Sequence, residues 1–277
     1  MSYIIPFIIL ITVVVFVHEY GHYYFAKKYG VGVTDFSIGF GKEIFGFEDK
    51  NGTRWKFCIV PLGGYVKFFG DRNVFSQSEQ EEILKKYNKN DQERLFTIKP
   101  LYQRALIVFG GPLANFLLAI VIFSCIYMFV GKDFTPAKIA QVSVDSPAEK
   151  AGLQKNDVIV AINDNKVLSI REVSTFINTA SSNSIDITVL RNDREIVFKT
   201  DTKSIDSKDA FGNSIKKRIV GISIVPAKSE INLKKLGPTT AIYYSIKEIW
   251  FVSKTTLNYV RSLIMGQADT SQLGGPI

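Results

Sequence analysis

Two histidines and one glutamate stand at a spacing that suits a metal site. His18 and His22 are four residues apart, and Glu19 directly follows the first of them. On a helix, residues four apart lie on one face, so both imidazoles could bind one Zn²⁺ ion at about 2.0–2.1 Å. Glu19 is then placed to take a proton from a water molecule, as hydrolysis of a peptide bond requires. The pattern predicts a zinc centre with His18 and His22 as ligands and Glu19 as the catalytic base, and Gly21 would let another element approach the helix between the ligands.

The helix that must carry this motif is apolar. Residues 4–17 are almost wholly hydrophobic, and we expect the helix to run to about Tyr29, before Gly30. A cleaved signal peptide would need a basic start, which residues 1–3 do not provide. We therefore expect a first transmembrane helix within residues 1–29. Ionisable groups inside a membrane helix are costly and functional by default, which favours a metal site over coincidence.

A second apolar stretch covers residues 105–130 and carries no charge. At about 1.5 Å per residue it reaches roughly 39 Å, more than the ~30 Å hydrocarbon core of a bilayer. It predicts a second transmembrane helix, with a buried helix of a soluble domain as the alternative. Segment 24–104 holds 14 lysines and arginines, among them Lys27, Lys28 and Arg104 at the helix ends. Basic loops stay inside, so we expect this segment to be cytoplasmic and everything after residue 130 to lie outside.

Composition agrees with a membrane protein. Of the 277 residues, 46% are hydrophobic, the net charge is +8, and the mean hydropathy is +0.11. These values exclude a disordered or nucleic-acid-binding tail, and two cysteines are too few for a disulfide framework. The lipid bilayer is the expected partner, and no nucleic acid is expected.

Between the two apolar stretches, residues 30–75 predict a β loop. Residues 49–52 read Asp-Lys-Asn-Gly, a hairpin signal. The loop could pack locally, or its edge strand could capture a substrate by strand addition. Residues 76–104 are polar and predict a solvated cytoplasmic linker, in which Ser78 could cap a short helix.

The composition turns soluble from about Phe134. Residues 146–163 resemble the core of a bacterial PDZ domain, and we place a PDZ-like domain at 133–226. The expected elements are a short helix over 148–153 that Gly152 ends, a groove helix over 171–180, and strands over 158–162, 185–190, 196–199 and 220–224. Its groove could bind a trimmed chain end, could exclude bulky substrates, or could have no ligand.

Residues 233–265 show apolar side chains at helical spacing, with Lys247, Lys254 and Arg261 recurring every seven residues. This pattern predicts an amphipathic helix, broken once or twice, at the outer membrane surface. A third transmembrane helix and a helix packed on the PDZ-like domain are the alternatives. Residues 266–277 would begin a further membrane region.

Several motifs together resemble the site-2 protease family of intramembrane zinc metalloproteases, and within it the bacterial regulator-of-sigma-E protease subgroup. They are the His18–His22 motif in the first membrane helix, Phe-Ser-Ile-Gly-Phe-Gly at 36–41, Pro-Leu-Gly-Gly-Tyr-Val-Lys at 61–67, and Gly-Gly-Pro-Leu-Ala-Asn-Phe at 110–116.

The resemblance implies a polytopic α-helical membrane protein with a membrane-associated β loop and an extracytoplasmic PDZ (α+β) domain. It implies a bacterial inner membrane and single-pass membrane substrates, such as anti-sigma factors or signal peptide remnants. Asn115, Gly63 and Gly64 would help to position the substrate. For Asn115, a buried amide satisfied by neighbouring helices is the alternative.

One part of the family pattern has no counterpart here. The family's third zinc ligand is an Asp within a Leu-Asp-Gly motif of a later membrane helix, and this sequence has no such motif. The loop carboxylates Asp35, Glu43 and Asp71 offer no reason to prefer one of them. We therefore expect a C-terminally truncated fragment that binds zinc poorly and is inactive as given. The alternative function is a non-catalytic, membrane-tethered PDZ adaptor with an incomplete metal site.

Overall fold

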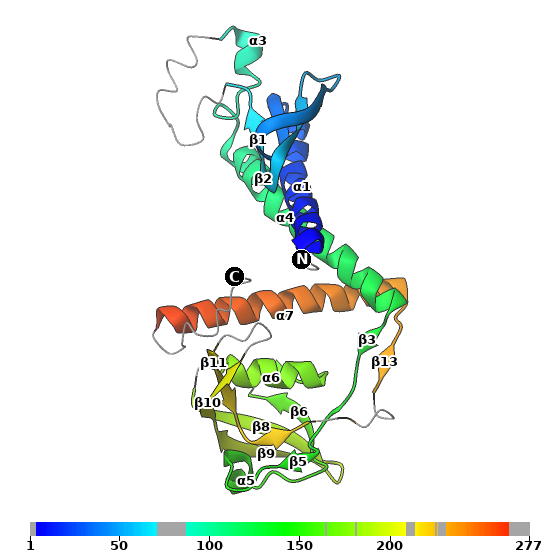
Figure 1. Ribbon diagram of the computed structural model, residues 1–277, viewed down its shortest axis with the longest axis vertical. Coiled ribbons are helices and arrows are strands. Elements are labelled where there is room, and N and C mark those ends of the chain that lie inside the picture. The colour runs from blue at the N-terminus through cyan, green and yellow to red at the C-terminus, as the bar shows by residue number, and fades with distance from the viewer. Residues whose placement is uncertain are drawn as a thin grey trace. The chain divides into compact units, whose positions relative to one another are not determined.

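The computed structural model describes residues 4–70, 87–163, 165–180, 182–208, 214–224, 226 and 231–265. The chain divides into two compact units, 1–122 and 123–277, and each is described by itself (Figure 1). The expected linker up to residue 86, with Ser78, and the segment 266–277 lie outside the described residues.

Two long apolar helices form the frame of the first unit. Helix α1 (Ile4–Lys28) has 25 residues and α4 (Leu101–Phe129) has 29. Within the described residues they are the two helices long and apolar enough to cross a membrane. The α4 helix begins four residues earlier than the apolar stretch, directly after Pro100, whose carbonyl accepts hydrogen bonds from the first helical turn. The boundary between the units falls within α4.

A hairpin packs against α1. Its strands are β1 (Val33–Glu48) and β2 (Arg54–Phe68), and the turn between them is the one that the sequence indicated. Gly39 and Gly41 have positive φ angles of 86° and 89°, which lets β1 fold back on itself. As a result, the first half of β1 pairs with both halves of β2, so that residues 64–68 form one edge and residues 43–48 the other. A single hairpin thus makes a curled sheet beside the helix.

Apolar side chains join the hairpin and both helices just beyond the motif. Ala26, Val31, Val33 and Ile107 are buried together, and aromatic rings surround them. A short helix, α3 (Lys89–Gln92), follows, with the Asn88 side chain accepting from the Asp91 N–H at its start. This cluster fixes the C-terminal end of α1, which carries His22, against α4.

The second unit contains a mixed domain around one hydrophobic core. Its central sheet has the order β4-β6-β8-β9, with β7 on β6, and smaller two-stranded ladders pair β5 with β12, β3 with β13 and β10 with β11. The strands are β3 (Lys132–Asp133), β4 (Ala137–Lys138), β5 (Gln141–Val142), β6 (Val158–Ile162), β7 (Asn165–Lys166), β8 (Ser184–Arg191), β9 (Arg194–Asp201), β10 (Lys203–Lys208), β11 (Ser214–Ile219), β12 (Ile222–Ser223) and β13 (Leu233–Lys234).

Two helices cover this sheet. Helix α5 (Pro147–Ala151) begins at Ser146, whose hydroxyl accepts from the Glu149 N–H, and ends at Gly152 with φ at 90°. Helix α6 (Ile170–Asn178) buries Val173 and Ile177 on the core. The predicted segments lie within one or two residues of α5, α6, β6, β8, β9 and β12. The β10–β11 hairpin and the short strands β3, β4, β5, β7 and β13 have no counterpart among them.

Helix α7 (Pro238–Ile264) is continuous, so the predicted breaks are wrong. No glycine or proline follows Pro238 within the helix to interrupt it. One face packs on the domain: the Phe251 ring meets the Phe176 ring of α6 at 5.3 Å. The same face also binds the end of α4, because Glu248 accepts from Tyr127 and forms an ion pair with Lys132 at 3.0 Å.

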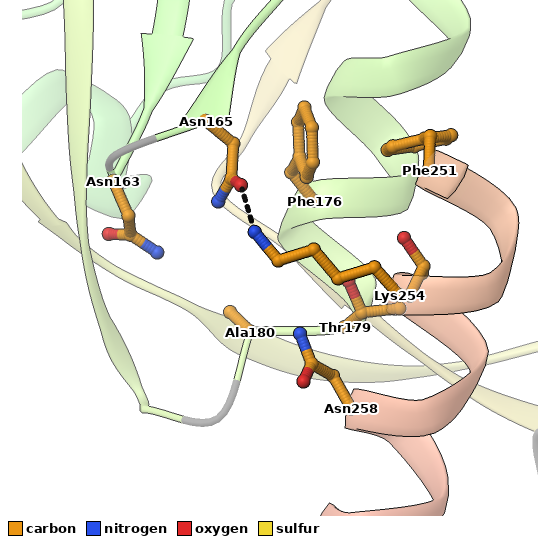
Figure 2. A pocket seen from close by; sticks show the side chains of 9 residues that line it. Asn163, Asn165, Phe176, Thr179, Ala180, Phe251, Lys254 and Asn258 are labelled. Carbon is orange, nitrogen blue, oxygen red and sulfur yellow. Dashed lines mark hydrogen bonds between the residues drawn. The ribbon is translucent and has the colours of Figure 1, made fainter. Parts of the chain in front are cut away.

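A small cavity of about 150 Å³ lies where α7 passes the β6–β7 turn and the end of α6. Figure 2 shows Lys254 of α7 reaching across it to Asn165, with Asn163 and Asn258 beside them. Lys254 thus points towards the domain along this part of the helix.

Candidate metal centre

The two histidine rings project from one face of α1. Their centroids lie 4.8 Å apart and the rings are nearly perpendicular, at 79°. This is what a spacing of four residues gives on a regular helix. The side chains therefore have the separation that a shared metal ion would need.

Both Nε2 atoms face one small space beside Gly111 of α4. A Cβ atom added at Gly111 would lie 2.4 Å from His22 Nε2 and 2.7 Å from His18 Nε2. Glycine is therefore the residue that leaves this space open. Neutral imidazole nitrogens are preferred zinc ligands, so this cradle fits two of the ligands of a zinc ion.

Close helix packing brings α4 to this position. A Cβ atom at Gly21 would lie 2.2 Å from the Gly110 carbonyl oxygen, and one at Gly110 would lie 2.6 Å from the Gly21 carbonyl oxygen. Small residues at a crossing let two membrane helices approach closely. The expectation that Gly21 admits another element between the ligands is confirmed, and that element is α4.

The other nitrogen of each histidine also contacts α4. His22 Nδ1 lies 2.8 Å from the Ile107 carbonyl oxygen, and His18 Nδ1 lies 3.2 Å from the Asn115 amide nitrogen. The Asn115 oxygen is buried and has no hydrogen-bond partner. The sequence did not reveal these partners, because they lie 85 and 97 residues from their histidines.

Glu19 meets the hairpin. The Val66 backbone lies beside its carboxylate, and a Cβ atom at Gly64 would lie only 3.2 Å from Glu19 Cγ. The absence of a side chain at Gly64 therefore lets the edge of β2 lie directly on the expected catalytic base. Gly63 faces elsewhere, against the Phe40 ring. The assignment of Gly63, Gly64 and Asn115 to substrate positioning stays a prediction.

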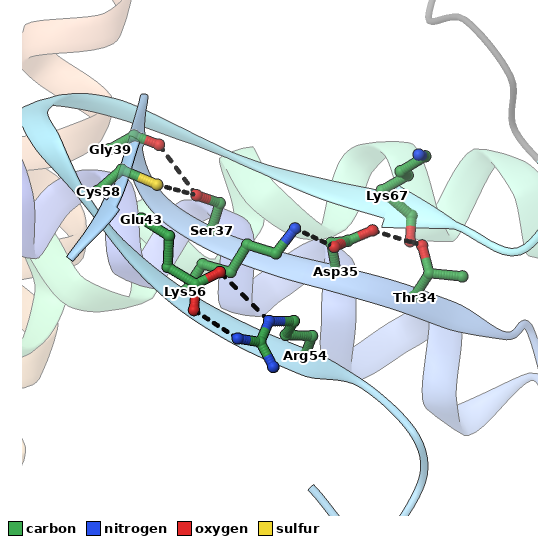
Figure 3. Close-up of polar contacts among 9 residues, drawn as sticks. All are labelled: Thr34, Asp35, Ser37, Gly39, Glu43, Arg54, Lys56, Cys58 and Lys67. Carbon is green, nitrogen blue, oxygen red and sulfur yellow. Dashed lines mark hydrogen bonds and ion pairs between the residues drawn. The ribbon is translucent and has the colours of Figure 1, made fainter. Parts of the chain in front are cut away.

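Two of the three loop carboxylates form ion pairs with basic side chains of β2. Figure 3 shows Asp35 paired with Lys56, and Glu43 with Arg54 at 2.7 Å. Burial tends to raise the pKa of Asp35, but Lys56 and the Thr34 hydroxyl outweigh it and hold that pKa below its usual value. Asp71 lies outside the described residues. Within the part of the chain that the structure describes, no group of three or more His, Cys, Asp or Glu side chains could hold a metal ion.

One further residue ties the hairpin to the motif helix. Asp49, in the turn, accepts hydrogen bonds from the Tyr23 hydroxyl at 2.9 Å and from Trp55 Nε1 at 3.2 Å. Tyr23 directly follows His22. The hairpin signal predicted the turn, but nothing in the sequence indicated that its carboxylate reaches α1.

Comparison with known proteins gives one family. The model of "Peptidase family M50" matches residues 6–277. A protein of Mesorhizobium japonicum, named as a zinc metalloprotease, is 36% identical over 99% of this chain and 75% of its own length. The Metalloprotease MmpA of Caulobacter vibrioides is 31% identical over 99% of this chain and 70% of its own length. Among solved structures, the PDZ domain of an SdrC-like protein from Listeria monocytogenes matches 33% of this chain over 90% of its own length. The identity is 22% and the TM-score 0.26, and a likeness of that size does not establish a fold.

Proposed function

The chain belongs to peptidase family M50, the site-2 protease family, and from this premise we propose that it cleaves peptide bonds within or near membrane-spanning segments. The coarser assignment, a zinc metalloprotease, is supported by the relatives that carry that name. One observation carries the finer proposal: the Nε2 atoms of His18 and His22 on α1 converge beside Gly111 of α4. Both helices are long and apolar enough to cross a membrane.

In this proposal the three residues of the motif have separate roles in metal binding and proton transfer. His18 and His22 would hold the zinc ion, which supplies polarisation of the peptide carbonyl and acidifies a water molecule. Glu19 would take the proton of that water and pass it to the leaving amine. The neighbouring Val66 N–H would help to orient the carboxylate.

The hairpin edge would hold the substrate. A helical segment shields its own peptide groups, so a protease must unwind it, and an added strand replaces the lost backbone hydrogen bonds. Residues 64–68 pair only with β1 among the described residues and so form an edge next to Glu19. This arrangement favours substrate capture over local packing as the role of the hairpin.

We further propose the membrane arrangement that the charges indicate. Lys27 and Lys28 end α1, and Arg104 lies in the first turn of α4, which favours a cytoplasmic hairpin and an extracytoplasmic second unit in a bacterial inner membrane. Substrates would be single-pass membrane proteins such as anti-sigma factors or signal peptide remnants. The domain of the second unit, PDZ-like in sequence, would bind a trimmed chain end or exclude bulky substrates.

The experiment replaces Glu19 with Gln in detergent-purified full-length protein. A single-pass substrate is added and the cut is mapped by mass spectrometry. We expect a cut within the apolar span that Glu19→Gln slows by about 10²-fold or more, as loss of a general base does, while the zinc content stays unchanged. Glu43→Gln is the matched control, because Glu43 pairs with exposed Arg54 instead.

The second candidate, a non-catalytic membrane adaptor, is favoured by the absence of a three-residue ligand group within the described residues. It predicts no stoichiometric zinc and no cleavage that depends on Glu19, with binding of peptide termini retained. That outcome would replace the protease proposal.

A further inference from the structure

We propose that Asn115 is a positioning residue of the metal centre: its side-chain oxygen accepts the Nδ1 proton of His18 and so leaves His18 Nε2 free for the metal ion. The inference rests on the proposed function, because it takes the two histidines to be ligands. It gives Asn115 a partner within the protein, in line with the buried-amide alternative rather than with the substrate contact that the resemblance implied.

The tautomer of each histidine decides whether it can bind a metal. A neutral imidazole carries one proton, so Nε2 can bind a metal only when that proton is on Nδ1. His22 meets this condition, because the Ile107 carbonyl 2.8 Å from its Nδ1 can only accept a hydrogen bond. Its Nε2 therefore faces the space beside Gly111 without a proton.

His18 has a partner that can act in either sense. With the Asn115 amide nitrogen towards it, His18 Nδ1 accepts, and the proton must sit on Nε2, where it would oppose metal binding. The Asn115 oxygen meanwhile is buried without a partner. A half-turn of the amide brings that oxygen to His18 Nδ1, which then donates. Metal binding requires this second orientation, and the unpaired oxygen shows that the first satisfies the amide incompletely.

The spacing along α4 supports the same role. Ile107, Gly111 and Asn115 follow one another at intervals of four residues, so they share one helix face. That face presents a carbonyl acceptor for His22, an open space for both Nε2 atoms, and an amide for His18. Metal-bound histidines usually donate their other N–H to such a partner, and removing the partner typically weakens metal affinity about 10–100-fold.

The test compares two replacements of Asn115. The protein is purified in detergent without a histidine tag, and its zinc dissociation constant is measured by competition with a chelating dye. We expect Asn115→Leu, which keeps the approximate size but cannot accept, to bind zinc about 10–100-fold more weakly. Asn115→Asp, which always accepts, should stay within a few-fold of the unaltered protein. Leu117→Ala, at an exposed α4 position, is the control and should leave the constant unchanged.

A spectroscopic measurement separates positioning from general support of the fold. The chain has two histidines, so nitrogen-15 labelling of histidine gives two rings to assign. In zinc-loaded protein we expect the Nδ1 resonance of His18 to report a hydrogen-bonded N–H with Asn or Asp at position 115. With Leu, that signature should be lost at His18 and kept at His22.

The outcomes are distinct. If the unaltered protein binds no zinc, the proposed function and this inference fail together. If the unaltered protein binds zinc and Asn115→Leu binds it equally well, with the His18 signal unchanged, only the inference is overturned. In that case a loss of cleavage in Asn115→Leu would return Asn115 to substrate positioning.

Discussion

A methyl group at position 111 would occupy the space that both histidine Nε2 atoms face. We therefore expect Gly111→Ala to weaken zinc binding by at least about 10-fold, because the rings must turn away from the shared point. Alanine is favoured over glycine in a helix by roughly 0.5–1 kcal/mol, so the replacement itself does not disfavour α4. The measurement is zinc content after dialysis, with circular dichroism to check the fold. Gly237→Ala, where an added Cβ meets nothing within 4 Å, is the control. If Gly111→Ala kept its full zinc content, the two Nε2 atoms beside Gly111 would not be the zinc-binding site.

The residues of the site could be predicted from the sequence only where the pattern is local. His18, Glu19 and His22 share one helix turn, so their spacing alone indicates the metal chemistry. The roles of Ile107 and Gly111 depend on where α4 crosses α1, and that crossing depends on the contact between Gly21 and Gly110. No periodicity within either helix specifies it.

The element that brings β2 to Glu19 is the hairpin, and Asp49 ties its turn to α1. Burial acts to raise the pKa of Asp49, but hydrogen bonds from Thr53, Trp55, Tyr23 and Asn51 lower it to about 2, below its ordinary value of 3.8. A carboxylate whose pKa is lowered in the folded state stabilises that state above the unfolded pKa. The stabilisation is lost as the pH falls from about 4 through about 2.

The Trp55 ring, which donates to Asp49, reports this transition. With Trp250→Phe as background, Trp55 is the remaining tryptophan of the two. We expect its emission to shift to longer wavelength between pH 4 and pH 2. In Asp49→Asn the shift should be present at neutral pH, with no further step on acidification. Glu43→Gln should keep the step; an identical step in Asp49→Asn would show that another group titrates.

The sequence predicts the individual strands and helices better than it predicts how the strands pair. The Asp-Lys-Asn-Gly turn and the alternating strands indicate a hairpin. The double pairing of β1 depends on the bend at Gly39 and Gly41, and nothing local determines which half of β2 each half of β1 meets. In helix α7, by contrast, packing preserves an element where the sequence predicts a break. Ser253, Thr255 and Thr256 are weak helix formers, but contacts with α6 and the end of α4 keep the helix continuous.

For the molecule as a whole, the two faces of α7 have different surroundings. Ala241 and Ser245 are buried, and the Ser245 hydroxyl lies 3.1 Å from that of Ser124 in α4. The opposite face leaves Trp250, Leu257 and Ile264 at 72%, 69% and 82% exposure. Lys247 and Arg261 lie at the border of this apolar stripe, whereas Lys254 reaches towards Asn165 of the domain. This division of side chains predicts that α7 lies flat in a membrane interface, with Lys247 and Arg261 near anionic headgroups.

The α7 stripe therefore predicts that Trp250 enters the bilayer. In proteoliposomes containing anionic lipid, with Trp55→Phe as background, we expect lipids brominated high on the acyl chain to quench Trp250, and aqueous iodide to quench it weakly. The control moves the tryptophan to the face of α7 that lines the cavity near Asn165. In Asn258→Trp combined with Trp250→Phe, the brominated lipid should quench the tryptophan fluorescence only weakly. If iodide quenches Trp250 fully and the brominated lipid does not, the stripe faces water or another protein, and α7 is a helix that packs on the domain without touching lipid.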